Sequence, residues 1–124
     1  MTWLAIAAGG ALGAIARHAL NSLFHGRFNG FPAGIFVVNI LGCLAIGVLA
    51  GLLASTRLQI GDVGRNFVIV GLLGGFTTFS SFGLDTFALS RDGHTGLAAL
   101  NAAGQPLVGM AAVWLGYVVG SWRP

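Results

Sequence analysis

The chain reads Gly71-Leu72-Leu73-Gly74-Gly75-Phe76-Thr77-Thr78-Phe79-Ser80-Ser81-Phe82-Gly83 in the middle of a long apolar segment. Four hydroxyl side chains lie here within a few positions of one another. Because a helix turns by about 100° per residue, these hydroxyls point all around the helix axis, and no single neighbouring helix could cover them. Lipid offers them no partner, so we expect protein to surround the segment. The glycines just before them predict a break in the helix, a feature found where backbone lines a cavity at membrane depth.

The composition places this segment in a membrane. The 124 residues are 56% hydrophobic and only 7% charged, against roughly 25% charged residues in soluble domains. A spanning helix needs about 20 apolar residues, so the chain has room for one bundle and no second domain. We therefore predict a multi-pass protein of the lipid bilayer, with residues 1–124 forming one domain. The six basic residues are all arginines scattered singly, which argues against a surface for nucleic acids.

Four apolar segments separated by polar connections predict four spanning helices, at about residues 3–23, 33–54, 66–89 and 96–122. Pairs of glycines four residues apart recur in the first, second and fourth helices and give smooth faces for close helix contact. These pairs are Gly9 and Gly13, Gly47 and Gly51, and Gly116 and Gly120. The expected fold class is therefore an all-α bundle whose third helix is broken.

Two polar side chains stand out in the first two predicted helices. Arg17 indicates either a water-filled vestibule or a side chain that extends from the helix end to the membrane surface. Asn39 is the one strongly polar side chain of the second helix. It fits either an interhelical hydrogen bond or an amide donor aimed into a pore.

Three more polar side chains lie in the second half of the chain. Asn101 and Gln105 are one turn apart on a single helix face and fit either a polar track or a packing clamp. Asp85 could be a buried proton carrier. Its place about one turn before Arg91 favours an interfacial residue or a salt-bridge partner instead.

The chain offers no arrangement suited to enzyme catalysis, because we find no nucleophile beside a base, no paired carboxylates and no metal-ligand spacing. We therefore expect no enzyme. A proton-coupled exporter of small ions or drugs is the alternative, since small four-helix exporters of similar length also pair as dimers. Such exporters resemble one another in carrying a membrane-embedded carboxylate on the first helix. Here that helix carries Arg17 and no acid, which points to an anion instead.

An anion could be held by the uncharged groups of the central segment. Phe79 and Phe82 are three residues apart and share a helix face. Core packing is the usual role of such rings, but the positive edge of a phenyl ring can also face an anion. Hydroxyls and amides can donate hydrogen bonds to it. A row of such weak contacts suits conduction, because an ion must enter favourably and still leave.

Four motifs of the chain resemble, in order and spacing, the small bacterial fluoride channels of the Fluc or CrcB family. They are Gly10-Ala11-Leu12-Gly13-Ala14-Ile15-Ala16-Arg17, Asn39-Ile40-Leu41-Gly42-Cys43, Gly74-Gly75-Phe76-Thr77-Thr78-Phe79-Ser80-Ser81-Phe82 and Ala112-Val113-Trp114-Leu115-Gly116. The third motif is highly specific, and the resemblance covers nearly the whole chain.

The resemblance implies a four-helix subunit that forms an antiparallel, dual-topology homodimer with two fluoride pores in the cell inner membrane. It implies a channel that passively exports cytoplasmic fluoride and so relieves fluoride toxicity. The residues implied to line the pores are Asn39, Thr78, Phe79, Ser80, Ser81, Phe82, Asn101 and Gln105. The family commonly has a serine in place of Gln105, so the implied polar track fits Asn101 better.

The same resemblance implies a structural sodium ion at the dimer axis, held by the backbone carbonyls of Gly74 and Thr77. It also places Arg17 in the vestibule near the pore entrances. A helix broken after Gly74-Gly75 would free carbonyl groups for a cation, and a second, symmetry-related copy would double the oxygen atoms supplied.

The distribution of arginines predicts insertion in both orientations. If the four helices alternate in direction, Arg57, Arg65 and Arg123 lie on one side of the membrane. Arg17, Arg27 and Arg91 then lie on the other side. Three against three leaves no strong preference under the rule that basic loops stay in the cytoplasm. Antiparallel pairing through the glycine-rich faces could then close a two-fold dimer.

Overall fold

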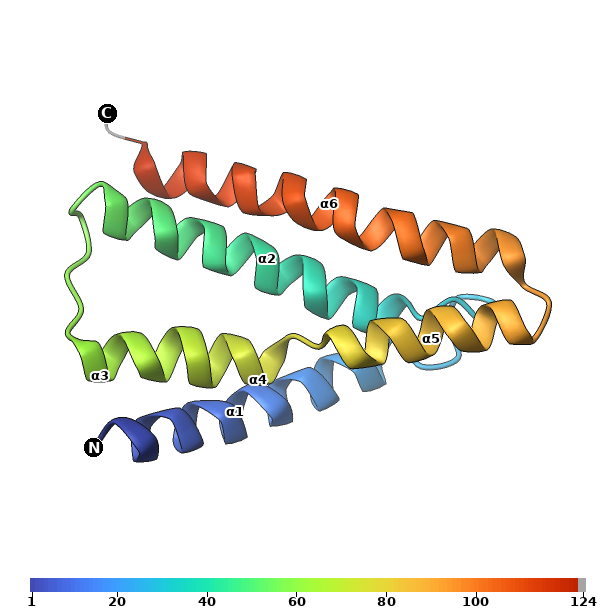
Figure 1. Cartoon of the computed structure of the whole chain (residues 1–124), viewed down its shortest axis with the longest axis horizontal. Coiled ribbons are helices and arrows are strands. Elements are labelled where there is room, and N and C mark those ends of the chain that lie inside the picture. The colour runs from blue at the N-terminus through green and yellow to red at the C-terminus, as the bar shows by residue number, and fades with distance from the viewer. Residues whose placement is uncertain (123–124) are drawn as a thin grey trace.

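The computed structural model describes residues 1–122, and its regular elements are all helices (Figure 1). The first, second and fourth spans are single helices: α1 (Thr2–Leu23), α2 (Ala33–Ala54) and α6 (Thr95–Ser121). Together with the segment Asp62–Arg91, they give four helical stretches long and apolar enough to cross a membrane. The predicted all-α class with four spanning helices is confirmed.

The third span is assembled from four shorter helical pieces. It begins with α3 (Asp62–Arg65), continues as a π-helix, η1 (Asn66–Leu73), and ends its first half with one turn, α4 (Gly74–Phe76). After two residues outside any helix, α5 (Phe79–Arg91) completes the span. The predicted break in this helix is therefore present.

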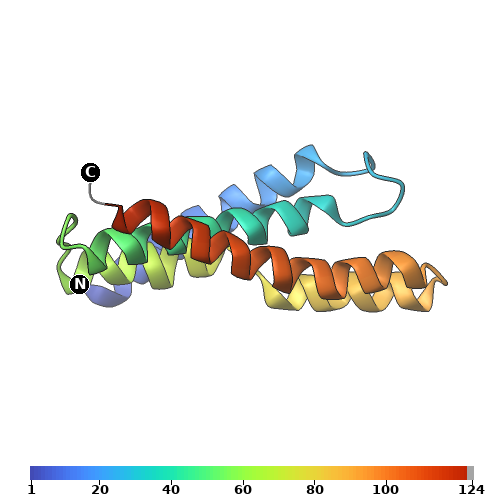
Figure 2. The ribbon, with the colours of Figure 1, turned by 90° about the horizontal axis from the view of Figure 1, so that it is seen from above.

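The four spans form two packed pairs joined at the break (Figures 1 and 2). Along most of its length α2 packs on α6, while α1 packs on η1 and α4. The helix α5 leaves α1 and packs mainly on α6. Figure 1 shows the N-terminus, the α2–α3 connection and the end of α6 together at one end of the bundle. The other two connections lie at the opposite end.

Close helix crossings depend on the glycine pairs. A Cβ atom on Gly13 would lie against the Leu72 carbonyl oxygen, and one on Gly47 would lie against the Val113 carbonyl oxygen. Gly116 similarly meets the backbone of α2 at Leu44. These faces are therefore occupied inside the subunit. The expectation that they pair two subunits is wrong for these positions, because each already packs against a helix of its own chain.

We expect Gly47→Ala to destabilise the subunit by about 1–3 kcal/mol, as overpacked cores do. The new methyl group would meet the rigid Val113 backbone, with its carbonyl carbon 3.0 Å away. Gly96→Ala is the matched control, because a Cβ there meets nothing within 4 Å. Thermal unfolding in detergent, followed by circular dichroism, measures both. Equal midpoints for the two variants would contradict the proposed role of Gly47.

The subunit buries polar side chains and exposes apolar ones. Val38 and Asn101 are its largest fully buried side chains, and Gln105 is only 6% exposed. Large apolar side chains such as Trp3 and Met110 lie on the outside. A water-soluble domain shows the opposite distribution. This arrangement fits lipid around the bundle and places the polar residues at its functional centre.

Candidate functional site

The break in the third span falls at Thr77 and Thr78, whose backbones are extended (φ −82°, ψ 160° and φ −155°, ψ 117°). Gly74 keeps helical angles. The break therefore lies at the threonines and not at the glycines that predicted it. The Thr77 hydroxyl and backbone N–H both donate to the Leu73 carbonyl at 3.0 Å, which closes the last turn before the break.

Asn39 of α2 closes the gap in the backbone hydrogen bonding. Its Oδ1 accepts from the Thr78 N–H at 2.9 Å, and its Nδ2 donates to the Thr78 carbonyl at 3.0 Å. In a continuous helix, that N–H would bond the Gly74 carbonyl. The side-chain amide thus replaces the helical acceptor of the Thr78 N–H and adds a donor to the Thr78 carbonyl, which also accepts the first bond of α5 as its N-cap carbonyl. The interhelical hydrogen bond proposed for Asn39 is present, and it is made to the backbone of the break.

A row of side-chain amides continues from Asn39 across α6. Nδ2 of Asn39 donates to Oε1 of Gln105 at 2.7 Å, and Nε2 of Gln105 donates to Oδ1 of Asn101 at 2.9 Å. Nδ2 of Asn101 then donates to the Thr86 hydroxyl at 2.8 Å, which itself donates to the Phe82 carbonyl at 2.8 Å. The structure therefore joins Gln105 and Asn101 as one polar track. Thr86 was not expected, because a helical threonine usually bonds the carbonyl four residues back and gives no distinct signal in a sequence.

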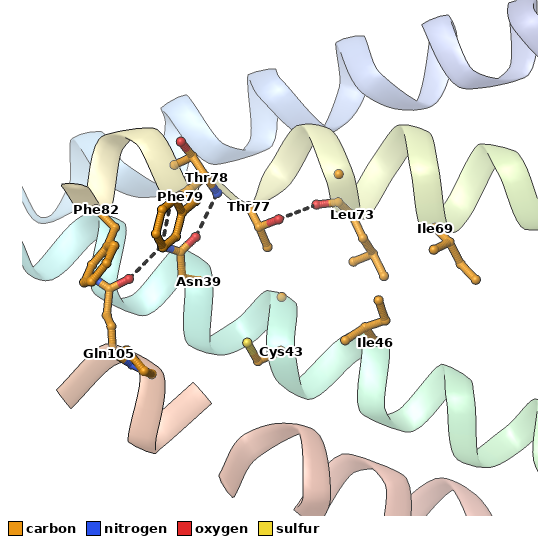
Figure 3. A pocket seen from close by; sticks show the side chains of 13 residues that line it. Asn39, Cys43, Ile46, Ile69, Leu73, Thr77, Thr78, Phe79, Phe82 and Gln105 are labelled. Atoms are coloured by element: carbon orange, nitrogen blue, oxygen red, sulfur yellow. Dashed lines mark hydrogen bonds between the residues drawn. The ribbon is translucent and has the colours of Figure 1, made fainter. Parts of the chain in front are cut away.

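Beside this row lies a hollow of about 440 Å³, the central hollow (Figure 3). It is lined by Asn39, Gly42, Cys43, Ile46, Ile69, Leu73, Gly74, Thr77, Thr78, Phe79, Phe82, Gln105 and Pro106. None of these side chains is charged. The rings of Phe79 and Phe82 lie 5.4 Å apart at 44°, and Phe79 is 82% exposed. The subunit alone therefore leaves this ring uncovered.

The Thr78 hydroxyl caps α5 and gathers the hydroxyls of Ser80 and Ser81 around it. The Thr78 hydroxyl accepts from the Ser81 N–H at 3.2 Å and donates to the Ser81 hydroxyl at 3.1 Å. It also lies 3.2 Å from the Ser80 hydroxyl. Ser80 is exposed, so one subunit does not surround the segment as expected. Ser80, Ser81 and Asn101 lie close to the central hollow but do not line it.

Arg17 lies at the break. Its Nη1 donates to the Thr77 carbonyl at 3.1 Å, and its side chain is partly buried. The guanidinium therefore bonds backbone inside the subunit, which differs from a side chain extended to the membrane surface. It shares that carbonyl with the implied sodium site, and a carbonyl oxygen has two lone pairs to offer.

Asp85 does not form the salt bridge with Arg91 that its spacing favoured. Arg91 pairs with the neighbouring Asp92 at 2.8 Å, and this hydrogen bond lowers the pKa of the Asp92 carboxyl. Oδ2 of Asp85 is buried without a hydrogen-bond partner. The carboxyl lines a second, smaller hollow near His94 and is absent from the lining of the central one.

Comparison with known proteins adds two findings. The family model described as "CrcB-like protein, Camphor Resistance (CrcB)" matches residues 4–117. A relative from Opitutus terrae, named "Fluoride-specific ion channel FluC", is 48% identical over 118 residues, covering 94% of this chain and 89% of the relative. Relatives of the same name from Paracoccus denitrificans and Chloroflexus aurantiacus are 45% and 42% identical over 119 and 120 residues. Each of these two alignments covers 96% of this chain and 94% of the relative.

Proposed function

Since the chain belongs to the CrcB family, we propose that it is a fluoride-selective channel through which cytoplasmic fluoride leaves the cell passively. Relatives that are 42–48% identical carry the name of a fluoride-specific channel. The observation that carries the proposal is the uncharged lining of the central hollow, where amide and hydroxyl groups lie beside two phenyl rings. Such groups hold an anion weakly at several points, as conduction requires.

Passive conduction requires no proton carrier. A proton-coupled exporter would need a carboxylate where the ion passes, and the central hollow has none among its lining residues. The proposal also assigns no enzyme activity, because the relatives on which it rests are named as ion channels, which are not enzymes. We also propose that the protein lies in the cell inner membrane, where it would relieve fluoride toxicity; its four helical stretches long and apolar enough to cross a membrane support a place in a bilayer.

Release from liposomes tests this function. Purified protein in vesicles loaded with potassium fluoride should release fluoride down its gradient, with a potassium ionophore letting potassium leave to balance the charge and no proton gradient present. Vesicles loaded with chloride should retain it. Fluoride movement that strictly required proton counter-transport would instead support the exporter. Absence of flux in correctly folded protein would reduce it to a non-conducting membrane subunit.

The proposed channel is an antiparallel homodimer of subunits inserted in both orientations. Two observations support a second subunit: the Phe79 ring at the break is 82% exposed in one subunit, and the polar Ser80 beside it is exposed as well. The arginines are balanced between the ends of the bundle, with Arg57 and Arg65 at one end and Arg27 and Arg91 at the other. Arg17 lies at the break, and Arg123 lies outside the described residues.

We expect each connection to be accessible from both sides of the membrane in comparable amounts. Single cysteines placed at residue 28 or at residue 59, after Cys43→Ala, can be labelled in intact cells with a membrane-impermeant maleimide. About half of each variant should react before lysis, because the charge balance gives neither orientation an advantage. If only one of the two connections reacted from outside the cell, the dual-topology dimer would be excluded.

We further propose that a sodium ion at the dimer axis is held by backbone carbonyls of Gly74 and Thr77. The break supports this, because the Thr78 N–H bonds Asn39 and leaves the Gly74 carbonyl without its helical partner. These carbonyls are hard oxygen ligands with no net charge, which suits a monovalent ion that the protein holds as a structural link.

We expect the dimer to unfold at a higher temperature in sodium chloride than in N-methylglucamine chloride of equal ionic strength, since a bound ion stabilises the state that binds it. Thermal unfolding with detection of dimer dissociation measures this without depending on flux. A crystal structure of the dimer should show carbonyl ligands around the ion. Equal midpoints, together with a water molecule at the axis, would contradict the sodium site.

A further inference from the structure

We propose that Asn39, Gln105, Asn101 and Thr86 form an amide relay that a permeating fluoride ion reverses, so that Gln105 becomes a donor to the ion. The inference rests on the proposed function, because it concerns how the same pore holds its ion. It assigns Thr86 a role as the positioning residue that lets the relay point either way.

Asn39 has no free donor hydrogen in the structure. Its Nδ2 has two hydrogens, and both are used, one on the Thr78 carbonyl and one on Oε1 of Gln105. The bond to Thr78 belongs to the pair that closes the helix break. An anion that takes a hydrogen bond from Asn39 must therefore displace the Gln105 oxygen.

The groups at the two ends of the relay determine which way its hydrogen bonds run when no ion is bound, which we call the resting state. At one end the Thr78 N–H can only donate, so Oδ1 of Asn39 faces it and Nδ2 faces Gln105. At the other end the Phe82 carbonyl can only accept, so the Thr86 hydroxyl donates to it. Every amide between them then turns its oxygen toward Asn39 and its nitrogen toward Thr86. In this state Gln105 presents an acceptor, which repels an anion.

Reversal costs no hydrogen bond. If Gln105 turns its amide, Nε2 donates to the ion and Oε1 accepts from Nδ2 of Asn101. Oδ1 of Asn101 then accepts from the Thr86 hydroxyl, which rotates away from Phe82. The Phe82 carbonyl keeps the helical bond it receives within α5. Four bonds before reversal become four bonds after it, with two of the final four made to the ion by Asn39 and Gln105.

The inner part of the relay is enclosed, so water does not compete with the bond between Gln105 and Asn101. Asn101 has no exposed surface and Gln105 is 6% exposed, while Gln105 borders the central hollow with Asn39, Phe79 and Phe82 (Figure 3). Buried amides must remain bonded in either state. A hydroxyl at residue 86 meets this need in both directions, since it can donate and accept.

Thr86→Val removes two bonds from the resting state and one from the reversed state. The substitution should therefore favour the reversed state and lower the fluoride concentration that half-saturates flux by about fivefold to tenfold. Thr86→Ser keeps the hydroxyl and should behave as the wild type. Damage to folding would weaken fluoride binding and so raise the half-saturating concentration, which is the opposite of the expected change. An unchanged or raised half-saturating concentration in Thr86→Val, or a shift shared by Thr86→Ser, would overturn the relay.

A spectroscopic measurement reads the reversal directly. The chain has two glutamines, Gln59 and Gln105, so selective ¹⁵N labelling gives two side-chain amide signals. Titration of the purified dimer with sodium fluoride should move the Gln105 signal saturably, while sodium chloride moves neither. In Thr86→Val, the Gln105 signal should lie near its wild-type position before fluoride is added and should move at a fluoride concentration about fivefold to tenfold lower. Gln59, in the α2–α3 connection, is the internal control.

The two measurements separate the relay from the proposed function. If liposomes that contain the wild-type protein released no fluoride, the proposed channel function would be overturned. Wild-type flux accompanied by a Gln105 signal that fluoride does not move would overturn the relay alone.

Discussion

Replacing Phe79 or Phe82 with isoleucine is expected to lower fluoride flux on the order of tenfold while the dimer persists, since a ring contact of about 1.5 kcal/mol corresponds to that factor. Both rings line the central hollow, and their centroids are 5.4 Å apart. An aliphatic side chain fills similar space but has no positive edge to face an anion. The double variant should lose nearly all flux, because no other aromatic ring lines the hollow.

Phe87→Ile is the matched control for these variants. Phe87 lies on the same helix, is exposed in the subunit, and does not line the central hollow. It should keep wild-type flux. Fluoride release from liposomes at equal protein density, with dimer content checked by size-exclusion chromatography, compares the wild type with the four variants. Wild-type flux in Phe79→Ile and Phe82→Ile would mean that the rings serve only to pack the bundle.

The spans of the fold followed from hydropathy, because a membrane imposes one length and one polarity on each helix. The position of the break in the third span did not follow from hydropathy. The glycines at 74 and 75 tolerate helical angles, and the chain leaves the helix at Thr77 and Thr78, where Asn39 supplies replacement hydrogen bonds. That partner is 39 residues away in the chain, and local sequence carries no record of it.

The glycine pairs are a second feature that the sequence predicted only in part. Their spacing correctly indicated close contact, yet spacing on one helix does not say which helix it meets. Gly47 and Gly116 meet each other's helices within the subunit, so the surface left for a partner subunit is formed by other residues. Helix faces were predictable from the pattern alone, whereas their pairing required the tertiary structure.

Polar residues in the bundle were easier to find than to assign. Asn39, Asn101 and Gln105 were evident because an amide is costly in an apolar span. Their order in one row depends on the crossing of α2, α5 and α6. Thr86 joins the row through its hydroxyl, a group that in any helix can bond the carbonyl four residues back, as it does here at Phe82. The proposed relay therefore rests partly on a residue type that sequence reasoning treats as neutral.

The other large effect is expected at Asn39, where alanine should reduce fluoride flux by about a hundredfold or more. The substitution removes three hydrogen bonds and leaves the Thr78 N–H without its partner, at about 1–3 kcal/mol for an unpaired donor. The two halves of the third span would then lose their fixed alignment. The ion would also lose the amide that the proposed pore offers it.

Loss of conduction and loss of stability must be measured separately, because Asn39 supports both. Asn39→Asp keeps the size of the side chain and its acceptor for the Thr78 N–H. It replaces the donor with an anionic oxygen that faces the Gln105 carbonyl and repels fluoride. We expect this variant to stop flux as fully as alanine does. Its unfolding temperature should lie closer to that of the wild type.

Asn66→Ala is the control, since Asn66 is a helical asparagine at the membrane edge whose amide bonds only the Asp62 carbonyl among the described residues. It should change neither flux nor stability appreciably. If Asn39→Ala and Asn39→Asp lowered the unfolding temperature but conducted fluoride at the wild-type rate per folded dimer, Asn39 would be a structural clamp alone. The ion path would then have to pass the rings without an amide donor, and the amide relay would have no ion to receive its hydrogen bonds.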